Sequence, residues 1–465
     1  MSIGVKNLWI LTEERPKIEV LQTILQKFVT DYGIAAFVDP LRILPILENG
    51  RFTFLYELAG FRSNSVDRVY IRTVSGNSSF CDYIVFYQVE TPSPSDVPIY
   101  AIEETKTDDS ESRNTGVYQR CSKFVFVDHY YPKTKKIMLY NLKIGQKAKP
   151  TETNIFGTRM LLTIGVEIIG KVNDAKVFKP FTSIDELINF KNAMRKPPAG
   201  NVPITVTKYD DRIEVSGRLF KSDGLSHDPN IGALSIISDT LRKLGWDKDI
   251  VITHHGLLQK HVNGRSKFIL IANKVGIKLS GLNVPDAVMH DEYWHYDTSG
   301  EKLGTIFIHI VVESFTSGYS IFENHAGSEK GYFVSAKGEY IQLAKYSDRA
   351  KYKAGDKNEI IHIPDLILID LGKSEIINVE GKKYQFRQNG INELKNYDYI
   401  EEHYINKYYP GFSIVRTVVL YGSKEKHIVE IEVGFLLNED GDLILGIKAP
   451  SLFGKAISNL LDFWK

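Results

Sequence analysis

The chain has 465 residues, of which 43% are hydrophobic and 25% charged, with 35 glycines and 17 prolines. This is an ordinary globular composition, and it excludes a disordered, collagen-like or disulfide-stapled chain. The 58 Lys and Arg residues nearly balance the 57 Asp and Glu residues and give a formal net charge of +1. Bulk binding of polyanions through a global field is therefore excluded, while recognition through a local basic surface stays open.

A chain of this length predicts about two to four domains. Its two cysteines, Cys81 and Cys121, are too few for a zinc finger or a disulfide framework, and we expect reduced thiols. The apolar patch at 8–11 is too short for the hydrophobic part of a signal peptide, and no run of ~18 apolar residues occurs. These features predict a cytoplasmic protein with no membrane partner.

In chain order, the first predicted element is a helix that starts after Pro16 and has an apolar face formed by Ile18, Leu21, Leu25 and Phe28. Five strands are then expected, the second and third as a hairpin joined through turn residues. Their ranges are 69–74, 83–89, 99–105, 124–127 and 136–140. The segment 195–201, rich in Pro and Gly, is the best linker in the chain.

Beyond the linker, Pro229 opens a predicted helix with Leu234, Ile237, Leu241 and Leu244 on one face and Gly245 as its carboxy-terminal cap. Two strands are expected after it, at 250–253 and 268–272, before periodicity is lost over 281–304. The remaining sequence is rich in strand-like runs. We therefore expect three parts, at 1–200, 201–290 and 291–465.

The most informative pattern lies in the last part. Two apolar runs flank the turn at 372–374 and predict a β-hairpin. Asp365 precedes the first strand and Glu380 ends the second, so antiparallel pairing brings them to one end of the hairpin, with Lys382 on the same face as Glu380. Two carboxylates and a lysine suit Mg²⁺, which activates water and neutralises charge on a phosphate, while Lys382 orients that water or stabilises the developing charge.

Pro364-Asp365 and Glu380-Gly381-Lys382 resemble the signature of the PD-(D/E)xK nuclease superfamily. A helix expected at 389–406 and an apolar strand at 413–421 follow in the order that the family shows. The resemblance implies an α/β (mixed α+β) fold, with restriction-endonuclease-like cores in which a central mixed sheet is flanked by helices. It also implies Mg²⁺ as the cofactor, bound by Asp365 and Glu380.

A second set of residues repeats this pattern near the amino terminus. Asp82 opens one predicted strand, and Glu104-Thr105-Lys106 closes its partner. Because side chains alternate along a strand, Glu104 shares a face with Lys106, and we choose Glu104 over Glu103 as the ligand. The set resembles the Asp plus Glu-x-Lys variant of many type II restriction endonucleases, although Cys81 stands where Pro is usual. The resemblance implies a second Mg²⁺ site at Asp82 and Glu104, and whether both sites are catalytic stays open.

Together the two motifs predict a type II restriction endonuclease that hydrolyses double-stranded DNA, with nuclease domains at 1–200 and 291–465. Two unlike sites in one chain would suit an asymmetric sequence, one site for each strand, and action as a monomer. A cognate methyltransferase would protect host DNA. Recognition is assigned to 201–290, either as a separate region or as a continuation of the first domain. The candidate contacts are Lys208, Arg212, Arg218, Lys221, Lys260, Arg265 and Lys267.

Two alternative functions remain open. A modification-dependent or repair nuclease would use the same chemistry, and a non-catalytic DNA-binding protein would carry these carboxylates as surface charge. His254, His255, His290 and His295 lack the partners of a zinc site, and we expect them to be ordinary loop histidines. No phosphate-binding Gly-x4-Gly-Lys-Ser/Thr loop occurs, so ATP is not expected as a partner.

Overall fold

The computed structural model describes most of the chain, and the statements below concern these residues: 5–48, 51–76, 80–105, 116–140, 151–170, 177–194, 204–221, 224–225, 229–288, 293–297, 301–325, 332–343, 362–423, 433–438, 443–445 and 449–464. By its internal contacts the chain divides into two compact units. The first unit comprises Met1–Ser75, Gln88–Thr91 and Tyr296–Lys465, and the second comprises Gly76–Tyr87 and Pro92–His295. The division into three parts expected from the sequence stays a prediction.

The amino-terminal part of the first unit is a set of four strands with one helix. Helix α1 (Ile18–Tyr32) follows Pro16, buries Leu21, Leu25 and Phe28 as predicted, and ends at Gly33, whose φ of 60° suits glycine. The strands run in the order β2-β3-β4-β1, with the β2–β3 and β3–β4 pairs antiparallel and the β1–β4 pair parallel. Their bounds are β1 (Lys6–Thr12), β2 (Ala36–Glu48), β3 (Arg51–Ser63) and β4 (Val66–Gly76).

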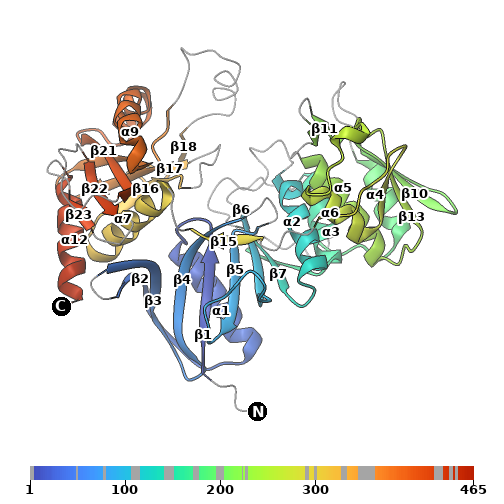
Figure 1. The fold of residues 1–465 in the computed structure, drawn as a ribbon, viewed down its shortest axis with the longest axis horizontal. Helices are drawn as coiled ribbons and strands as arrows, with labels where there is room; N and C mark the ends of the chain where they lie inside the picture. Colours follow the sequence, from blue (N-terminus) through green and yellow to red (C-terminus); the bar gives the residue numbers. More distant parts are fainter. Residues whose placement is uncertain are drawn as a thin grey trace. The chain divides into compact units, whose positions relative to one another are not determined.

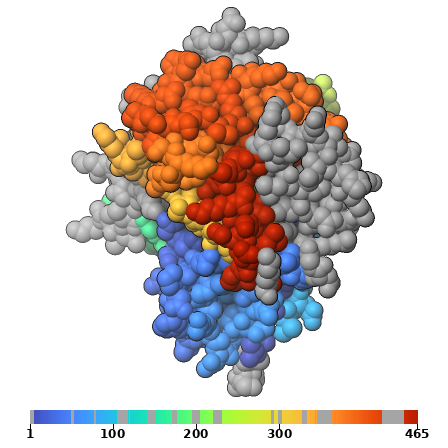
Figure 2. Space-filling model, turned by 90° about the vertical axis from the view of Figure 1, so that its left-hand side faces the viewer, coloured from blue at the N-terminus to red at the C-terminus, as the bar shows by residue number. Residues whose placement is uncertain are grey.

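The carboxy-terminal part of the first unit is built on the strand order β16-β19-β20-β21-β22-β23. The β16–β19 and β19–β20 pairs are antiparallel, β20–β21 and β21–β22 are parallel, and β22–β23 is antiparallel. Helix α7 packs against β20 and β21, and α12 packs on α7 at the surface of this unit (Figures 1 and 2). The bounds are α7 (Glu301–Phe315), β16 (Tyr319–Glu323), β17 (Tyr332–Val334), β18 (Tyr340–Gln342), β19 (Leu366–Asp370), β20 (Glu375–Lys383), β21 (Ser413–Ser423), β22 (Val433–Asn438), β23 (Leu443–Leu445) and α12 (Ser451–Phe463).

The connection from β20 to β21 is helical almost throughout, which agrees with the helix predicted at 389–406. It contains two short 3₁₀ turns and a π-helical turn among α-helical segments, in this order: η3 (Tyr384–Phe386), α9 (Arg387–Glu393), η4 (Leu394–Asn396), α10 (Asp398–Ile400), η5 (Glu401–Ile405) and α11 (Asn406–Tyr408). A helical crossover of this kind is what parallel pairing of two successive strands requires.

The second unit contains the strand order β5-β6-β7-β8, with β5–β6 antiparallel and the β6–β7 and β7–β8 pairs parallel. A separate four-stranded sheet has the order β14-β13-β10-β9. The bounds are β5 (Tyr83–Gln88), β6 (Tyr100–Thr105), α2 (Gly116–Tyr130), β7 (Lys135–Tyr140), α3 (Glu152–Thr163), β8 (Val166–Ile169), α4 (Ile184–Ala193), β9 (Thr205–Lys208), β10 (Arg212–Ser216), β11 (Phe220–Lys221), β12 (Gly224–Leu225), α5 (Pro229–Lys243), β13 (Asp249–Thr253), η1 (Gln259–His261), α6 (Lys267–Val275), β14 (Ile277–Leu279) and β15 (Trp294–Tyr296).

Two predicted strands are wrong, because 124–127 lies in α2 and 268–272 lies in α6. Helix α2 contacts α3, α5 and α6 as well as β6 and β7, so apolar residues surround it and helical periodicity disappears from its sequence. Helix α6 is only nine residues long, so its helical periodicity is short, but it has a recognisable amino-terminal cap. Ser266 caps the helix by accepting a hydrogen bond from the amide of Ile269.

At the level of fold class the prediction is confirmed, since the protein is mixed α/β with a large mixed sheet flanked by helices. Among the described residues, no helix has the length and apolar character needed to cross a membrane.

Candidate metal centres

The structure brings Asp365, Glu380 and Lys382 together at one end of the β19–β20 hairpin. Leu366 pairs with Val379, so Asp365 stands beside Glu380, and the backbone amide of Gly381 donates a hydrogen bond of 2.9 Å to Asp365 Oδ2. The two strands are held by a core of fully buried side chains, which fixes this register. The ends of the two strands therefore carry their carboxylates as a pair, as the sequence predicted.

Lys382 lies between two carboxylates of this centre. Its Nζ is 2.7 Å from Glu380 Oε1 and 2.9 Å from Oε2 of Glu393, which ends α9. Gly390 allows this approach, because a Cβ at that position would lie 2.8 Å from Lys382 Cγ. The Tyr397 hydroxyl donates a hydrogen bond to Glu380 Oε2. Glu393 was missed by the sequence reasoning, and only its place on the predicted helix could have indicated it.

Negative charge is in excess at this carboxy-terminal centre, where three carboxylates accompany one ammonium group. Burial, the neighbouring Asp365 and the hydrogen bond with Glu393 raise the pKa of Glu380, although Lys382 acts in the opposite direction. Burial and the Glu380 carboxylate also raise the pKa of Tyr397. A divalent cation would relieve this crowding, and paired carboxylates are the donors that Mg²⁺ prefers. The residues present therefore fit the predicted cofactor.

The amino-terminal set has the same backbone arrangement, shifted by one residue from the predicted one. Tyr83 pairs with Ile102, so the residue opposite Asp82 is Glu103. The amide of Glu104 donates a hydrogen bond of 2.7 Å to Asp82 Oδ2. This is the bond that Gly381 makes to Asp365, which makes Glu103 the counterpart of Glu380. The structure thus places Glu103, and not the predicted ligand Glu104, opposite Asp82, because the register between two strands is not encoded in their alternation. The assignment of Glu104 as a ligand stays a prediction.

Among the described residues of this amino-terminal centre, the ammonium group that contacts the carboxylates comes from a helix. Lys123 of α2 places its Nζ 2.7 Å from Glu103 Oε1 and 3.8 Å from Asp82 Oδ1. Glu103 Oε1 also accepts 3.2 Å from the Asp82 amide, and Arg120 Nε lies 3.7 Å from Glu103 Oε2. Lys106, the predicted lysine, lies outside the described residues.

Electrostatics distinguish the two centres. Burial and Asp82 raise the pKa of Glu103 to about 7, against the opposing effect of Lys123 and Arg120. Burial and the nearby Lys123 lower the pKa of Lys267 to about 8, and Glu103 acts in the opposite direction, so Lys267 lies close to this centre. Lys123, Arg120 and Lys267 thus surround two carboxylates, whereas cations are outnumbered at the carboxy-terminal centre. Among the described residues, the carboxy-terminal centre therefore has the larger excess of carboxylates over cations.

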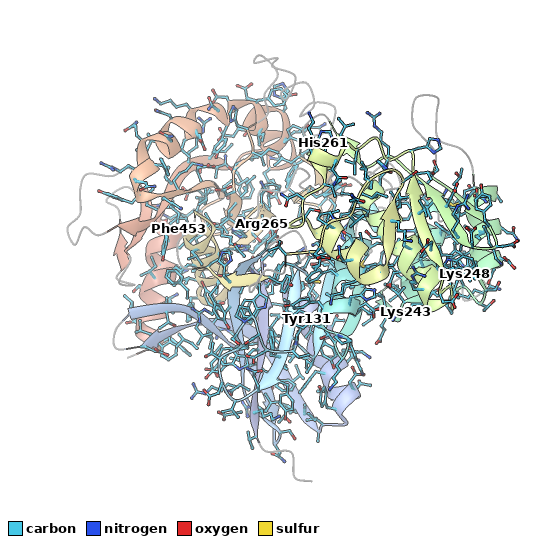
Figure 3. The ribbon with its side chains drawn as sticks, turned by 45° about the vertical axis from the view of Figure 1, so that its right-hand side comes forward. Tyr131, Lys243, Lys248, His261, Arg265 and Phe453 are labelled. Atoms are coloured by element: carbon cyan, nitrogen blue, oxygen red, sulfur yellow. The ribbon has the colours of Figure 1, made fainter. Side chains whose placement is uncertain are left out.

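The other predicted DNA contacts differ in their surroundings. Lys208 pairs with Asp185 at 2.8 Å and Arg212 with Glu214 at 2.8 Å, while the side chain of Lys221 lies outside the described residues. Arg218, Lys260 and Arg265 are exposed. Figure 3 places His261 and Arg265 on the opposite side of the second unit from Lys243 and Lys248.

The predicted loop histidines are consistent with structural roles where they are described. His255 Nε2 lies 2.9 Å from the carbonyl of Ser280 and its Nδ1 accepts from the Leu257 amide, while His254 Nδ1 lies 3.3 Å from Ser216 Oγ. His290 lies outside the described residues, and His295 is exposed.

A scan of protein-family models, a search of curated proteins and a search of solved structures each return no match to this chain.

Proposed function

We propose that the chain is a Mg²⁺-dependent endonuclease of double-stranded DNA, of the PD-(D/E)xK type II restriction class. One observation carries the proposal: two hairpins of the chain place Asp and Glu opposite each other through the same amide-to-aspartate hydrogen bond. Each hairpin is followed by a helical crossover to a parallel strand, β21 in one case and β7 in the other. A chance cluster of surface charge has no reason to repeat both features.

The topology of the first unit supports the same assignment. Helix α7 leads into β16, which is antiparallel to β19; β19 is antiparallel to β20, and the helical crossover leads to the parallel β21. This is the order implied by the resemblance, and it leaves Asp365 and Glu380 on neighbouring central strands. Asp365 and Glu380 would hold the cation, which supplies Lewis-acid activation of water and charge neutralisation on phosphate.

The remaining side chains of this centre have separate roles in the proposed reaction. Lys382 would donate a hydrogen bond to a phosphate oxygen as negative charge develops there. Tyr397 donates to Glu380 Oε2 and fixes the direction of the other carboxylate oxygen. Glu393 holds the Lys382 ammonium at 2.9 Å and prevents it from turning wholly toward Glu380.

Digestion of unmethylated DNA with the full chain and Mg²⁺, followed by sequencing of the fragment ends, tests the proposal. Discrete fragments that disappear with EDTA and with Asp365→Asn support a restriction endonuclease. Cleavage of methylated DNA alone would indicate the modification-dependent alternative. Binding of DNA without cleavage, under every divalent cation tried, would indicate a non-catalytic protein.

A further inference from the structure

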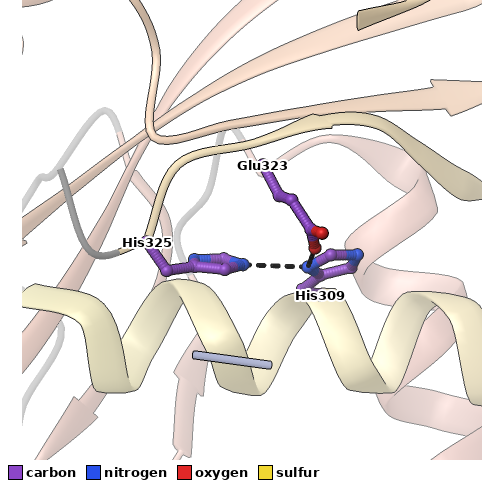
Figure 4. A group of neighbouring side chains, drawn as sticks. All are labelled: His309, Glu323 and His325. Atoms are coloured by element: carbon purple, nitrogen blue, oxygen red, sulfur yellow. Dashed lines mark hydrogen bonds and ion pairs between the residues drawn. The ribbon is translucent and has the colours of Figure 1, made fainter. Parts of the chain in front are cut away.

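A cluster with different chemistry lies elsewhere in the first unit, between α7 and β16. His309 of α7 is fully buried, His325 follows β16 and is 7% exposed, and Glu323 ends β16. His309 Nδ1 lies 2.9 Å from His325 Nε2 and 3.8 Å from Glu323 Oε2 (Figure 4). Two imidazoles and a carboxylate thus direct one atom each toward a common point, with all three atoms within 4.8 Å of one another.

The outer nitrogen of His309 is a donor. Its Nε2 lies 3.1 Å from Glu313 Oε1, an oxygen that also accepts from the backbone amide of Ser320 at 3.0 Å. The Ser320 hydroxyl donates to the same oxygen at 2.9 Å, and the other oxygen of Glu313 forms an ion pair with Arg15. Glu313 is therefore a carboxylate that can only accept, so the His309 proton resides on Nε2 and neutral His309 presents a lone pair at Nδ1.

The outer nitrogen of His325 can be a donor as well. The Thr305 hydroxyl lies 3.0 Å from both the carbonyl of Lys302 and His325 Nδ1. When its single proton goes to the carbonyl, the hydroxyl accepts from His325 Nδ1. Neutral His325 then presents a lone pair at Nε2. The two inner nitrogens, 2.9 Å apart, would face each other with lone pairs only. In that arrangement a positive charge lies between them, either a proton or a metal ion, whereas a Thr305 proton turned toward His325 Nδ1 leaves a neutral His325 that donates from Nε2 to His309 Nδ1.

We propose that His309 Nδ1, His325 Nε2 and Glu323 Oε2 form a binding site for one transition-metal dication of the Zn²⁺ type. Zn²⁺ binds imidazole nitrogen at about 2.0–2.1 Å, which at a tetrahedral angle separates two nitrogens by about 3.3–3.4 Å. An increase of a few tenths of an ångström in the 2.9 Å distance between His309 Nδ1 and His325 Nε2 would therefore admit the ion. Glu313 and Thr305 are hydrogen-bonded to the outer nitrogens of the two imidazoles. Such outer partners orient metal-binding histidines and fix their tautomers.

The site is distinct from the carboxylate centres in the metal that it prefers. Imidazole favours Zn²⁺, Co²⁺ or Ni²⁺, whereas carboxylates favour Mg²⁺. Arg15 and Lys17 lie 3.7 and 3.8 Å from the Glu323 oxygens and compete with the ion for this carboxylate. Since the amide of Asn324 donates to the carbonyl of Asp365 at 2.7 Å, the ion would fasten the strand beside the proposed catalytic aspartate. Its role would be structural.

Cobalt binding to the full chain, stripped with EDTA and then dialysed, tests the site. We expect one equivalent of Co²⁺ with visible d–d absorption, displaced by Zn²⁺, in the wild type and in the control variant His403→Gln, whose histidine is exposed. His325→Gln should lose this equivalent, and Glu323→Gln should weaken binding at least tenfold. Equal uptake by His325→Gln and wild type would overturn the proposal.

X-ray absorption of the zinc-loaded wild type gives a test that needs no variant to fold. Two imidazole ligands at about 2.0–2.1 Å are expected. A spectrum without two imidazoles, or a wild type that takes up no Co²⁺, would mean that the histidine pair shares a proton instead. Because neither measurement uses nuclease activity, the site can be overturned or supported independently of the proposed function.

Discussion

Replacing Lys382 by Met separates a role in the reaction from a role in folding. The ammonium group lies 2.7 Å from Glu380 and 2.9 Å from Glu393, and Met keeps most of the aliphatic stem while removing the charge. Removing one preorganised donor to developing negative charge typically lowers kcat by about 10²–10³-fold. We expect a loss of this size in the rate of Mg²⁺-dependent cleavage. Because Lys382 lowers the pKa of Glu380, we also expect that pKa to rise further in the variant.

The assay is cleavage of supercoiled plasmid that carries one recognition site, followed over time in Mg²⁺. Lys383→Met is the matched control, since Lys383 is the next residue of β20 and its side chain points to the other face of the strand. Circular dichroism establishes that both variants are folded. Wild-type rates for Lys382→Met, or an equal loss in Lys383→Met, would refute the assigned role.

Three further predictions concern the same centres. If each centre cuts one strand, Asp82→Asn and Asp365→Asn should each convert supercoiled plasmid to a nicked circle, with nicks on opposite strands by end sequencing; loss of all cleavage in either variant would exclude independent strand assignment. Because the pKa of Glu380 is raised, the metal-free folded state binds a proton that the unfolded chain releases, so stability falls as the pH rises above the ordinary carboxyl range. Glu380→Gln should therefore raise the Tm in EDTA at pH 8, by about 2–4 °C for each 1 kcal/mol relieved, and change it little at pH 4. Gly390→Ala should cost about 1–3 kcal/mol of unfolding free energy in urea titration, since its Cβ would lie 2.8 Å from Lys382 Cγ, and an unchanged midpoint would show that α9 moves aside freely.

Sequence reasoning succeeded where the pattern was local. The hairpin that carries Asp365 and Glu380, the helix after Pro16 and the helix opened by Pro229 all follow from turn residues and periodicity. These signals need only neighbouring residues. Turn residues and periodicity therefore identified the residues that can meet at the end of a hairpin.

The errors arose where long-range packing decides. The sequence of α2 is apolar on several sides because helices and strands enclose it, so it resembles a buried strand. Pairing of Asp82 with Glu103 depends on the register between two strands that are joined by a long connection, and no local signal reports that register. Lys123 and Glu393 reach the two centres from crossover helices, at positions set by helix-to-sheet packing.

The source of the ammonium group gives the two centres unequal rigidity. Lys382 and Glu380 stand two residues apart on one strand, so the covalent backbone and the sheet fix their separation. Lys123 and Glu103 belong to a helix and a strand, and a small sliding of α2 across β6 changes the distance between them. A displacement of α2 would therefore change the distance between Lys123 and Glu103 in the amino-terminal centre. The separation of Lys382 and Glu380 within β20 would stay the same.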